Sequence, residues 1–168
     1  MSKVYIVLGV SASGKTTIGK LLADKLDLSY YDADDFHSQE NIDKMRSGRS
    51  LNDEDRQPWL EAMALKIKVW TKGQGAVLGC SALKERYRKT LMDGCEAHVE
   101  WIYLKGSYEL LAKRSRERKG HYFKEKLLQS QFDTLEPPTY GIHVSVVPPP
   151  EKIVENILKG IRRIQSKA

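Results

Sequence analysis

The sequence has few cysteines and no long apolar run, and these two features argue against disulfide-rich, zinc-binding and membrane-spanning proteins. Cys80 and Cys95 are the two cysteines among 168 residues, and neither stands in a CxxC or a mixed Cys/His spacing. This pattern argues against a disulfide framework or a zinc site and favours free thiols in a reducing compartment. No stretch approaches the roughly 18 apolar residues of a membrane-spanning helix. We therefore expect a cytoplasmic protein that does not bind membranes.

Repeats, low-complexity segments and flexible linkers are absent as well. The composition, 40% hydrophobic and 30% charged, is that of an ordinary globular protein. Because an apolar run begins already at Val4, we expect no signal or transit peptide at this N-terminus. The length then suits one domain that spans residues 1–168 and can bury a sizeable core.

The most informative stretch is GVSASGKT at residues 9–16, which fits the phosphate-binding pattern GxxxxGK[ST] at every fixed position. An apolar run precedes it and apolar residues at helical spacing follow, as such a P-loop requires. The glycines let successive N–H groups point at phosphate oxygens, and the helix N-terminus adds partial positive charge. Lys15 can reach the β- and γ-phosphates of ATP, and the Thr16 hydroxyl can bind Mg²⁺. The predicted nucleotide-binding residues of this stretch are Gly9, Ser11, Ala12, Ser13, Gly14, Lys15, Thr16 and Thr17.

Strands and helices alternate along the chain, which predicts an α/β fold with a parallel sheet covered on both faces. Asn52 is a candidate cap for a long helix, although Pro58 leaves the start of that helix open. Trp59, Trp70 and Trp101 are interpreted as packing residues. The predicted strands are 4–8, 28–32, 76–80, 99–104 and 142–147. The first predicted helix follows the P-loop. The other predicted helices are 39–46, 53–70, a basic segment that ends at about residue 92, 108–119, 124–134 and 151–165. The residues predicted to point inward from two of them are Ile42, Met45, Ile153, Ile157, Ile161 and Ile164.

Charge is distributed unevenly within a net charge of +6. Acidic residues gather between Asp32 and Glu61, and basic residues between Lys84 and Lys126. Acidic side chains that leave the second strand lie where open α/β sheets bind ligands. The basic excess suits nucleic acid or a small polyanion. We favour the polyanion, because the P-loop supplies a triphosphate and no recognisable nucleic-acid module accompanies the charge.

The P-loop predicts a nucleotide but not a reaction. The sequence has no NKxD guanine motif, and its third predicted strand ends in Cys80 and Ser81 rather than in a Walker B aspartate. It is also short for a helicase or a transporter motor. Small-molecule kinases fit best, because they need a nucleotide loop, a substrate pocket and an arginine-bearing lid that excludes water.

The chemistry of phosphoryl transfer assigns roles to the charged residues. An acceptor hydroxyl needs a carboxylate that orients it and takes its proton, and Asp34 is the leading candidate. Asp32 can support Mg²⁺ through water. Arg114 and Arg118 stand four apart on one predicted helix, so both can face one pocket. The available partners for an acidic substrate are Arg56, Lys84 and Arg88.

Several segments resemble those of the gluconate kinase (gluconokinase) family of P-loop small-molecule kinases, which is related to shikimate kinase. The more specific ones are SALK at 81–84, RKGH at 118–121 and QFDTLEP at 131–137. The less specific matching segments are the P-loop, DADDFH at 32–37, NIDKM at 41–45, LNDEDR at 51–56, PWL at 58–60, YR at 87–88 and YLKG at 103–106. Together, the matching segments run in family order over nearly the whole chain.

This resemblance implies ATP-dependent phosphorylation of the 6-hydroxyl of D-gluconate, giving 6-phospho-D-gluconate, with Mg²⁺. It also implies a three-layer α/β/α fold with a five-stranded parallel sheet of the nucleoside-monophosphate-kinase type. A helical lid at about residues 119–138 would interrupt a core of residues 1–118 and 139–168, and a homodimer is common. The alternatives are a kinase for shikimate, another small acid or a nucleoside monophosphate. Shikimate kinases carry an arginine near the position of Glu136, which counts against shikimate.

The resemblance also implies individual site residues by their positions. Asp34 would contact the acceptor hydroxyl and Arg56 the gluconate carboxylate. Arg114 would lie near the adenine, Pro149 in the turn that lines the adenine pocket, and Arg118 would reach the phosphates from the lid. The implied catalytic residues are Lys15, Asp34 and Arg118. The implied substrate-binding residues are Asp34, His37, Arg56, Ser81, Lys84, Arg88, His121 and Gln131.

Overall fold

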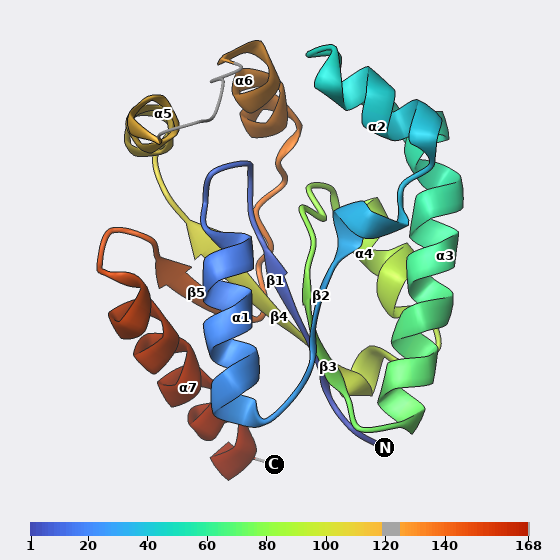
Figure 1. Cartoon of the computed structure of the whole chain (residues 1–168). Coiled ribbons are helices and arrows are strands. Elements are labelled where there is room, and N and C mark those ends of the chain that lie inside the picture. The colour runs from blue at the N-terminus through green and yellow to red at the C-terminus, as the bar shows by residue number, and fades with distance from the viewer. Residues whose placement is uncertain (119–124, 168) are drawn as a thin grey trace.

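The computed structural model describes residues 1–118 and 125–167. Its centre is one sheet of five strands in the order β2-β3-β1-β4-β5, and each neighbouring pair is parallel (Figure 1). The predicted α/β fold with a five-stranded parallel sheet is therefore confirmed. The strands are β1 (Val4–Leu8), β2 (Tyr30–Asp32), β3 (Ala76–Gly79), β4 (Val99–Lys105) and β5 (Ile142–Ser145).

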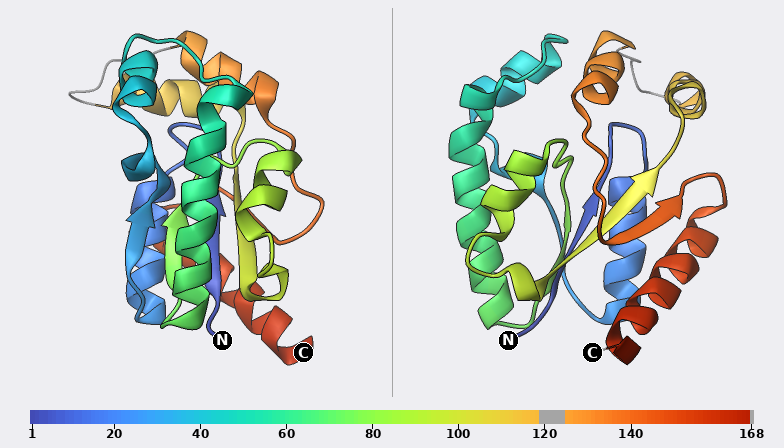
Figure 2. Two further views of the ribbon diagram at one scale, coloured as in Figure 1. Left: turned by 90° about the vertical axis from the view of Figure 1, so that its right-hand side faces the viewer. Right: turned by 180° about the vertical axis from the view of Figure 1, so that it is seen from behind.

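Helices cover both faces of this sheet and also lie beyond its carboxyl edge. In Figures 1 and 2, α1 and α7 pack on one face, α3 and α4 pack on the other, and α2, α5 and α6 lie past the ends of the strands. Both termini lie at the opposite end of the molecule (Figure 1). The helices are α1 (Lys15–Leu26), α2 (Gln39–Arg46), α3 (Asp53–Lys72), α4 (Glu85–Met92), α5 (Tyr108–Glu117), α6 (Glu125–Thr134) and α7 (Pro150–Lys167), with short 3-10 turns at Ala33–Phe36 and Glu96–His98.

The side chains of β1 divide the core into two layers. All five of its residues are buried, because a central parallel strand is covered on both faces. Tyr5 and Val7 point toward the layer that α1 and α7 complete. Val4, Ile6 and Leu8 point toward the layer beneath α3 and α4. This alternation anchors the segment that directly precedes the P-loop.

The long helix α3 begins before its proline, because a capping box sets its first turn. The Asn52 side chain accepts a hydrogen bond from the Asp55 N–H, and the Asp55 carboxylate accepts one from the Asn52 N–H. Three acidic residues in this turn also suit the positive end of the helix dipole. Pro58 is tolerated inside the helix and removes a single backbone donor.

Two of the predicted inward faces need correction. Ile164 is 37% exposed, whereas Ile153, Ile157 and Ile161 are buried, because the last turn of α7 runs past the sheet (Figure 1). In α2 the buried residue is Asn41, and the apolar Ile42 and Met45 are only half-buried.

Some predicted boundaries were also too wide. The second strand begins at Tyr30 rather than at residue 28, and the fifth ends at Ser145 rather than at residue 147. The proposed lid of residues 119–138 includes residues outside the described part of the chain, so its bounds and the single-domain division stay predictions.

Two isoleucines of α7 give a matched test of this packing. Ile157 is fully buried, so Ile157→Ala leaves a cavity and should lower the free energy of unfolding by about 2–4 kcal/mol. Ile164→Ala, the same change on the same helix, should alter it by less than about 0.5 kcal/mol. Urea denaturation of both variants measures the difference, and equal losses would contradict the assigned orientation of α7.

Candidate functional site

The P-loop between β1 and α1 has the backbone that its sequence requires. Gly14 adopts a φ of +96°, which favours glycine, and it precedes α1 without any side-chain cap. A Cβ at Gly9 would lie 2.6 Å from the Ser13 Oγ and 3.2 Å from the Leu104 carbonyl oxygen. The first amides of α1 are therefore left for a ligand rather than for a capping side chain.

Lys15 lies at the first position of α1 and folds back over the loop. Its ammonium donates hydrogen bonds to the carbonyl oxygens of Gly9 at 3.0 Å and Val10 at 3.1 Å. Burial lowers the pKa of Lys15, while the nearby Asp34 carboxylate opposes that shift. The cation is thus held beside the amides that face a phosphate.

A large cavity of about 730 Å³ opens along the outer side of the P-loop, and we call it the nucleotide cavity. It gathers residues from α1, the end of β2, α5 and the start of α7. Of the predicted nucleotide-site residues, all but Gly9 line it, because Gly9 is packed behind the loop. Its lining comprises residues 11–18, Asp32, Asp34, Arg114, Arg118, residues 147–150 and Ile153.

Arg114 fixes the wall of the nucleotide cavity formed by the turn after β5. Its guanidinium donates to the Val146 carbonyl oxygen at 2.6 Å and to the Val147 carbonyl oxygen at 3.3 Å. Pro149 follows in the same turn and lines the cavity. Arg118 lines it from the end of α5. The predicted pair of arginines is therefore brought to one pocket, although Arg114 is also bonded to backbone.

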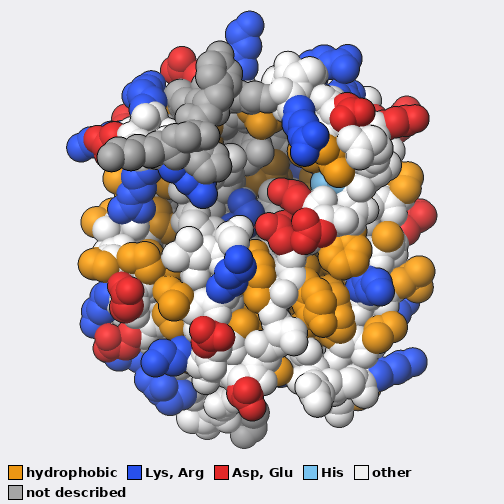
Figure 3. Space-filling view, viewed as in Figure 1, with side chains coloured by type: hydrophobic (Ala, Val, Ile, Leu, Met, Phe, Trp, Pro, Cys, Tyr) orange, Lys and Arg blue, Asp and Glu red, His pale blue; other side chains and the backbone are white. Residues whose placement is uncertain are grey.

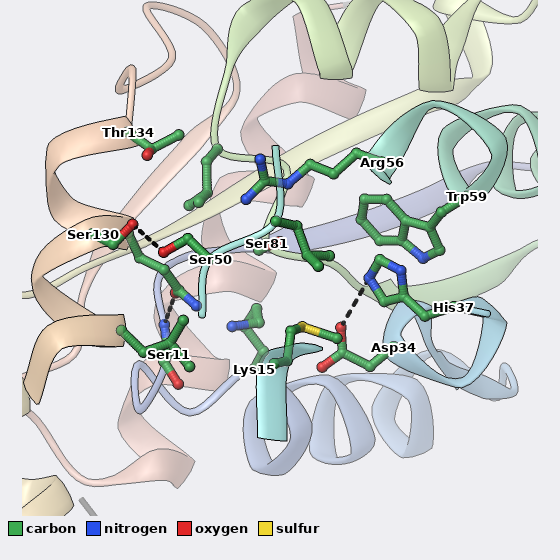
Figure 4. Close-up of a pocket in the computed structure, with 15 residues that line it drawn as sticks. Ser11, Lys15, Asp34, His37, Ser50, Arg56, Trp59, Ser81, Ser130 and Thr134 are labelled. Atoms are coloured by element: carbon green, nitrogen blue, oxygen red, sulfur yellow. Dashed lines mark hydrogen bonds and ion pairs between the residues drawn. The ribbon is translucent and has the colours of Figure 1, made fainter. Parts of the chain in front are cut away.

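A second, smaller cavity of about 90 Å³ lies on the other side of Lys15, and we call it the inner cavity (Figure 4). Ser11, Lys15 and Asp34 line both cavities, so the two meet at the P-loop. The predicted substrate residues Asp34, His37, Arg56, Ser81 and Gln131 all line the inner cavity. Its remaining residues are Ser11, Lys15, Met45, Ser50, Leu51, Trp59, Leu83, Leu127, Ser130 and Thr134.

Asp34 presents its carboxylate where the cavities join. Its side chain is 70% exposed to solvent, so the surrounding protein removes only part of its hydration. That partial desolvation, and next the charge of Asp32, raise the pKa of Asp34, while Lys15 opposes the shift. A raised pKa makes the carboxylate a better proton acceptor for a hydroxyl. Figure 3 shows acidic side chains gathered at the rim of a hollow on this face.

Asp32 and Thr16 provide an oxygen pair beside the P-loop. The Thr16 hydroxyl donates to the Asp32 Oδ2 at 3.5 Å, and the Asp34 N–H donates to the Asp32 Oδ1 at 2.9 Å. Mg²⁺ prefers oxygen ligands and keeps several waters, so these residues fit a cation bound together with phosphates. Among the described residues, no group of three or more His, Cys, Asp or Glu side chains could hold a metal by itself.

His37 lines the inner cavity with a side chain that is almost fully buried. Its ring stacks on Trp59 with centroids 4.3 Å apart and an angle of 14° between the planes. Burial, and next the charge of Arg56, lower the pKa of His37 to about 4, so the ring is neutral at pH 7. The Trp59 indole N–H donates to the Ala33 carbonyl oxygen at 2.7 Å, which holds the stacking partner in place. His37 therefore acts as a hydrogen-bonding group and not as a cation.

Arg56 is a second cation that lines the inner cavity, besides Lys15, and a neighbouring tyrosine holds its guanidinium. It donates to the Tyr87 hydroxyl at 3.0 Å, and its guanidinium carbon lies 5.2 Å from the centroid of the same ring. The Tyr87 hydroxyl in turn donates a short hydrogen bond to Asp53. This bond lowers the pKa of Asp53, and burial followed by Asp53 raises the pKa of Tyr87 to about 12. Asp53 stays ionised and Tyr87 protonated at neutral pH, so the chain Arg56–Tyr87–Asp53 has a fixed direction.

Helix α6 reaches over both the P-loop and the inner cavity. The Ser11 N–H donates to the Gln131 Oε1 at 2.6 Å, and the Ser50 hydroxyl donates to the Ser130 hydroxyl at 2.6 Å (Figure 4). Gln131 is thereby placed at the junction of the two cavities. His121, also predicted for this region, lies outside the described residues.

Two predicted substrate residues do not reach either cavity. Lys84 lies 3.3 Å from the Asp53 carboxylate instead. Arg88 is 1% exposed and donates to the carbonyl oxygens of Ala82 and Glu136 at 2.7 Å each, to the Tyr140 hydroxyl and to the Glu85 carboxylate. Each guanidinium nitrogen of Arg88 thus donates to another group of the protein, which stabilises the buried cation. The contact between Arg88 and the substrate stays a prediction that this arrangement does not support.

Several basic residues between Lys84 and Lys126 make separate contacts in different parts of the structure. Arg86 pairs with Asp53 at 2.9 Å, Arg88 is buried, and Arg114 and Arg118 line the nucleotide cavity. The basic charge therefore does not form one continuous face for nucleic acid among these residues. None of the described helices is long and apolar enough to cross a membrane.

Sequence reasoning missed several residues of the site. Trp59 was interpreted as packing, yet it also stacks on His37 and lines the inner cavity. Tyr87 and Asp53 were not assigned roles beside Arg56. Asn41, three residues after the capping Ser38, stands out in the sequence only as part of a matching motif. A polar residue at an inward helical position was the available signal for Asn41.

Comparisons with known proteins agree with this architecture. The sequence profile of the shikimate kinase family matches residues 11–143. A probable gluconokinase of Xenopus tropicalis is 45% identical over 151 residues, which cover 81% of this chain and 80% of that protein. The thermoresistant gluconokinase of Escherichia coli (strain K12) is 36% identical over 165 residues, covering 95% of this chain and 94% of the relative.

A solved structure extends the likeness to three dimensions. The crystal structure of a gluconokinase from Sinorhizobium meliloti 1021 superposes with a TM-score of 0.91 at 35% sequence identity, covering 98% of this chain and 94% of that one. The P-loop, the two joined cavities and these similarities lead to one conclusion. The chain belongs to the gluconokinase family, within the P-loop kinases that resemble shikimate kinase.

Proposed function

We propose that this protein is a gluconokinase that transfers the γ-phosphoryl group of ATP to the 6-hydroxyl of D-gluconate, giving 6-phospho-D-gluconate and ADP. The observation that carries the proposal is the junction of the two cavities. Lys15 and Asp34 line both of them, so a nucleotide in one and an acceptor in the other would meet at these side chains. Family membership supports the reaction and the substrate.

The nucleotide cavity would bind ATP through backbone and cations. The uncapped amides of α1 and Lys15 would contact the β- and γ-phosphates. Arg118 would stabilise negative charge on the transferring group. The turn held by Arg114 would form the wall beside the adenine.

The inner cavity suits an extended acid with a carboxylate at one end and a hydroxyl at the other. Figure 4 shows Arg56 on one side of the cavity, across from Lys15 and Asp34. Arg56 would bind the carboxylate, because a guanidinium matches its planar geometry. His37, Ser81 and Gln131 would contact the hydroxyl groups between the two ends.

Asp34 would receive the proton of the acceptor hydroxyl. As the acceptor oxygen forms its bond to the γ-phosphorus, the bond from that phosphorus to the β–γ bridging oxygen breaks, and ADP is released. The carboxylate orients the hydroxyl and takes its proton during this step. Closure by α6, through Gln131 and Ser130, would exclude water as a competing acceptor.

Thr16 and Asp32 would hold Mg²⁺, Asp32 through water, together with the phosphates. When bound, Mg²⁺ would neutralise charge that develops on the phosphate oxygens. The predicted homodimer and cytoplasmic location rest on the family resemblance and on the sequence.

A coupled ADP-release assay with Mg·ATP tests the substrate. We expect strong turnover with D-gluconate and little with shikimate, other sugar acids or nucleoside monophosphates. Arg56 and the residues that contact the hydroxyl groups would together match the length and the hydroxyl pattern of gluconate. Preferred turnover of another acceptor would contradict the substrate assignment and leave the phosphate chemistry intact. Absence of turnover with every acceptor would contradict the proposed activity.

Asp34→Asn tests the role of the carboxylate at nearly constant shape. The variant should lose about 10²–10⁴-fold in kcat, because the amide cannot take a proton, while its KM for ATP should change little. Lys15→Ala is the comparison, since it should damage both turnover and ATP binding. Near-normal turnover of Asp34→Asn in the same assay would remove Asp34 from the mechanism.

Tyr87→Phe tests whether the hydrogen bond to the Tyr87 hydroxyl positions Arg56 for substrate binding. The change removes the hydroxyl between Arg56 and Asp53, and it should raise the KM for gluconate about tenfold, the effect of losing one hydrogen bond to a charged group. The KM for ATP and kcat should stay close to those of the unchanged enzyme.

The matched control is Tyr140→Phe, which removes a hydroxyl bonded to Arg88 and Glu85, away from Arg56. This variant should leave the KM for gluconate unchanged. If both tyrosine variants have the same kinetics, Tyr87 has no specific effect on Arg56.

A further inference from the structure

Asn41 is a buried polar residue that lies behind His37 and outside both cavities. Its side-chain Nδ2 donates to the Asp55 carbonyl oxygen at 2.8 Å and lies 3.2 Å from the His37 Nδ1. A backbone carbonyl can only accept a hydrogen bond. The Asp55 carbonyl therefore determines which end of the Asn41 amide is the NH₂ group. That NH₂ group is also the one that meets His37.

This orientation determines where His37 carries its proton. Because the Asn41 NH₂ group donates, the His37 Nδ1 must accept, and the single proton of a neutral ring resides on Nε2. The opposite tautomer would place two donors against each other at 3.2 Å. A half-turn of the ring would put a carbon against Asn41 and lose the hydrogen bond.

The remaining freedom of the ring is removed by Trp59. The stacked indole holds the plane of the imidazole, and Asn41 fixes its rotation within that plane. The His37 side chain is only 4% exposed, so the ring has little room to reorient. The low pKa of His37, caused by burial and by Arg56, agrees with a ring that carries one proton at pH 7.

The protonated nitrogen faces the reacting end of the inner cavity. His37 Nε2 lies 3.9 Å from the Asp34 Oδ1, which is too long for a direct hydrogen bond (Figure 4). A hydroxyl oxygen placed about 2.8 Å from both atoms would complete a triangle. In that position it accepts a hydrogen bond from Nε2–H and donates its own proton to the carboxylate.

We propose that Asn41 is a positioning residue that holds the Nε2–H tautomer of His37, so that His37 donates to the substrate hydroxyl that Asp34 accepts from. Asn41 itself touches no substrate. The inference rests on the proposed function for the identity of that hydroxyl. The tautomer, by contrast, is a property of the unliganded protein and can be measured without any substrate.

Nitrogen-15 NMR of the histidine side chains in the 168-residue chain measures the tautomer directly. His37→Gln identifies the signals of His37 by their loss. In the unchanged protein at pH 7, we expect a protonated Nε2 and an unprotonated Nδ1. A proton on Nδ1 in this protein would overturn the proposal, and this measurement does not depend on any Asn41 variant folding.

Asn41→Asp replaces the donor with an acceptor of nearly the same shape. His37 should then carry a proton on Nδ1, and the KM for gluconate should rise about tenfold, with the KM for ATP unchanged. Asn41→Ala has no side-chain donor or acceptor beside His37. It should give a mixture of the two His37 tautomers and a smaller rise in the KM for gluconate. Retention of the Nε2–H form and of the original KM in both variants would overturn the proposal.

Gln39→Ala is the matched control on the same helix, because its exposed side chain donates to the Asp43 carboxylate at 2.8 Å. It should leave the His37 signals and both KM values unchanged. A change in the His37 tautomer in this variant would mean that α2 as a whole, not Asn41, holds the ring, and would overturn the proposal. If the unchanged protein does not phosphorylate gluconate, the proposed function fails, while the NMR spectra still decide the tautomer.

Discussion

Parallel alignment of the strands is the constraint on which the site depends, because it brings all their carboxyl ends to one edge of the sheet. The P-loop follows β1, Asp32 ends β2 with Asp34 in the turn behind it, and Ser81 follows β3. Since β1 lies next to β3 and β3 next to β2, segments distant in sequence become neighbours. The amides of α1 then face the same space as the acidic side chains, so phosphate binding and proton acceptance share one edge.

Behind the side chains that face the cavities lies a second set of buried polar contacts. His37 is held by Trp59 and Asn41, and Arg56 is held by Tyr87. A long or rotatable side chain loses conformational freedom when it binds a ligand, and a partner that orders it beforehand reduces that loss. His37 and Arg56 thus owe their positions in part to Asn41 and Tyr87, which lie outside the lining of the inner cavity.

The segment that follows α6 is tied firmly to the core. The Glu136 N–H donates to the Leu83 carbonyl oxygen at 2.7 Å, and its carboxylate accepts from the Glu85 N–H at 2.9 Å. Arg88 bonds to the Glu136 carbonyl oxygen as well. These bonds fix the end of α6 from which Gln131 reaches the P-loop. Arg88 thereby supports α6 through its bond to Glu136, whereas Arg56 lines the inner cavity.

The sequence by itself determined the P-loop, the alternation of strands and helices, and the position of Asp34 after a strand, because glycine spacing and apolar periodicity are local properties of the chain. Local patterns do not say which partner an element meets. Arg56 and Arg88 both stand in matching motifs, and only the packing of α3 against α4 decided that one faces the cavity and the other is buried. Ile164 has the spacing of an inward residue, but the sheet ends before α7 does. The role of Asn41 depends on Asp55, which a separate helix brings to its amide. Such contacts join residues far apart in sequence, and only the tertiary structure could decide them.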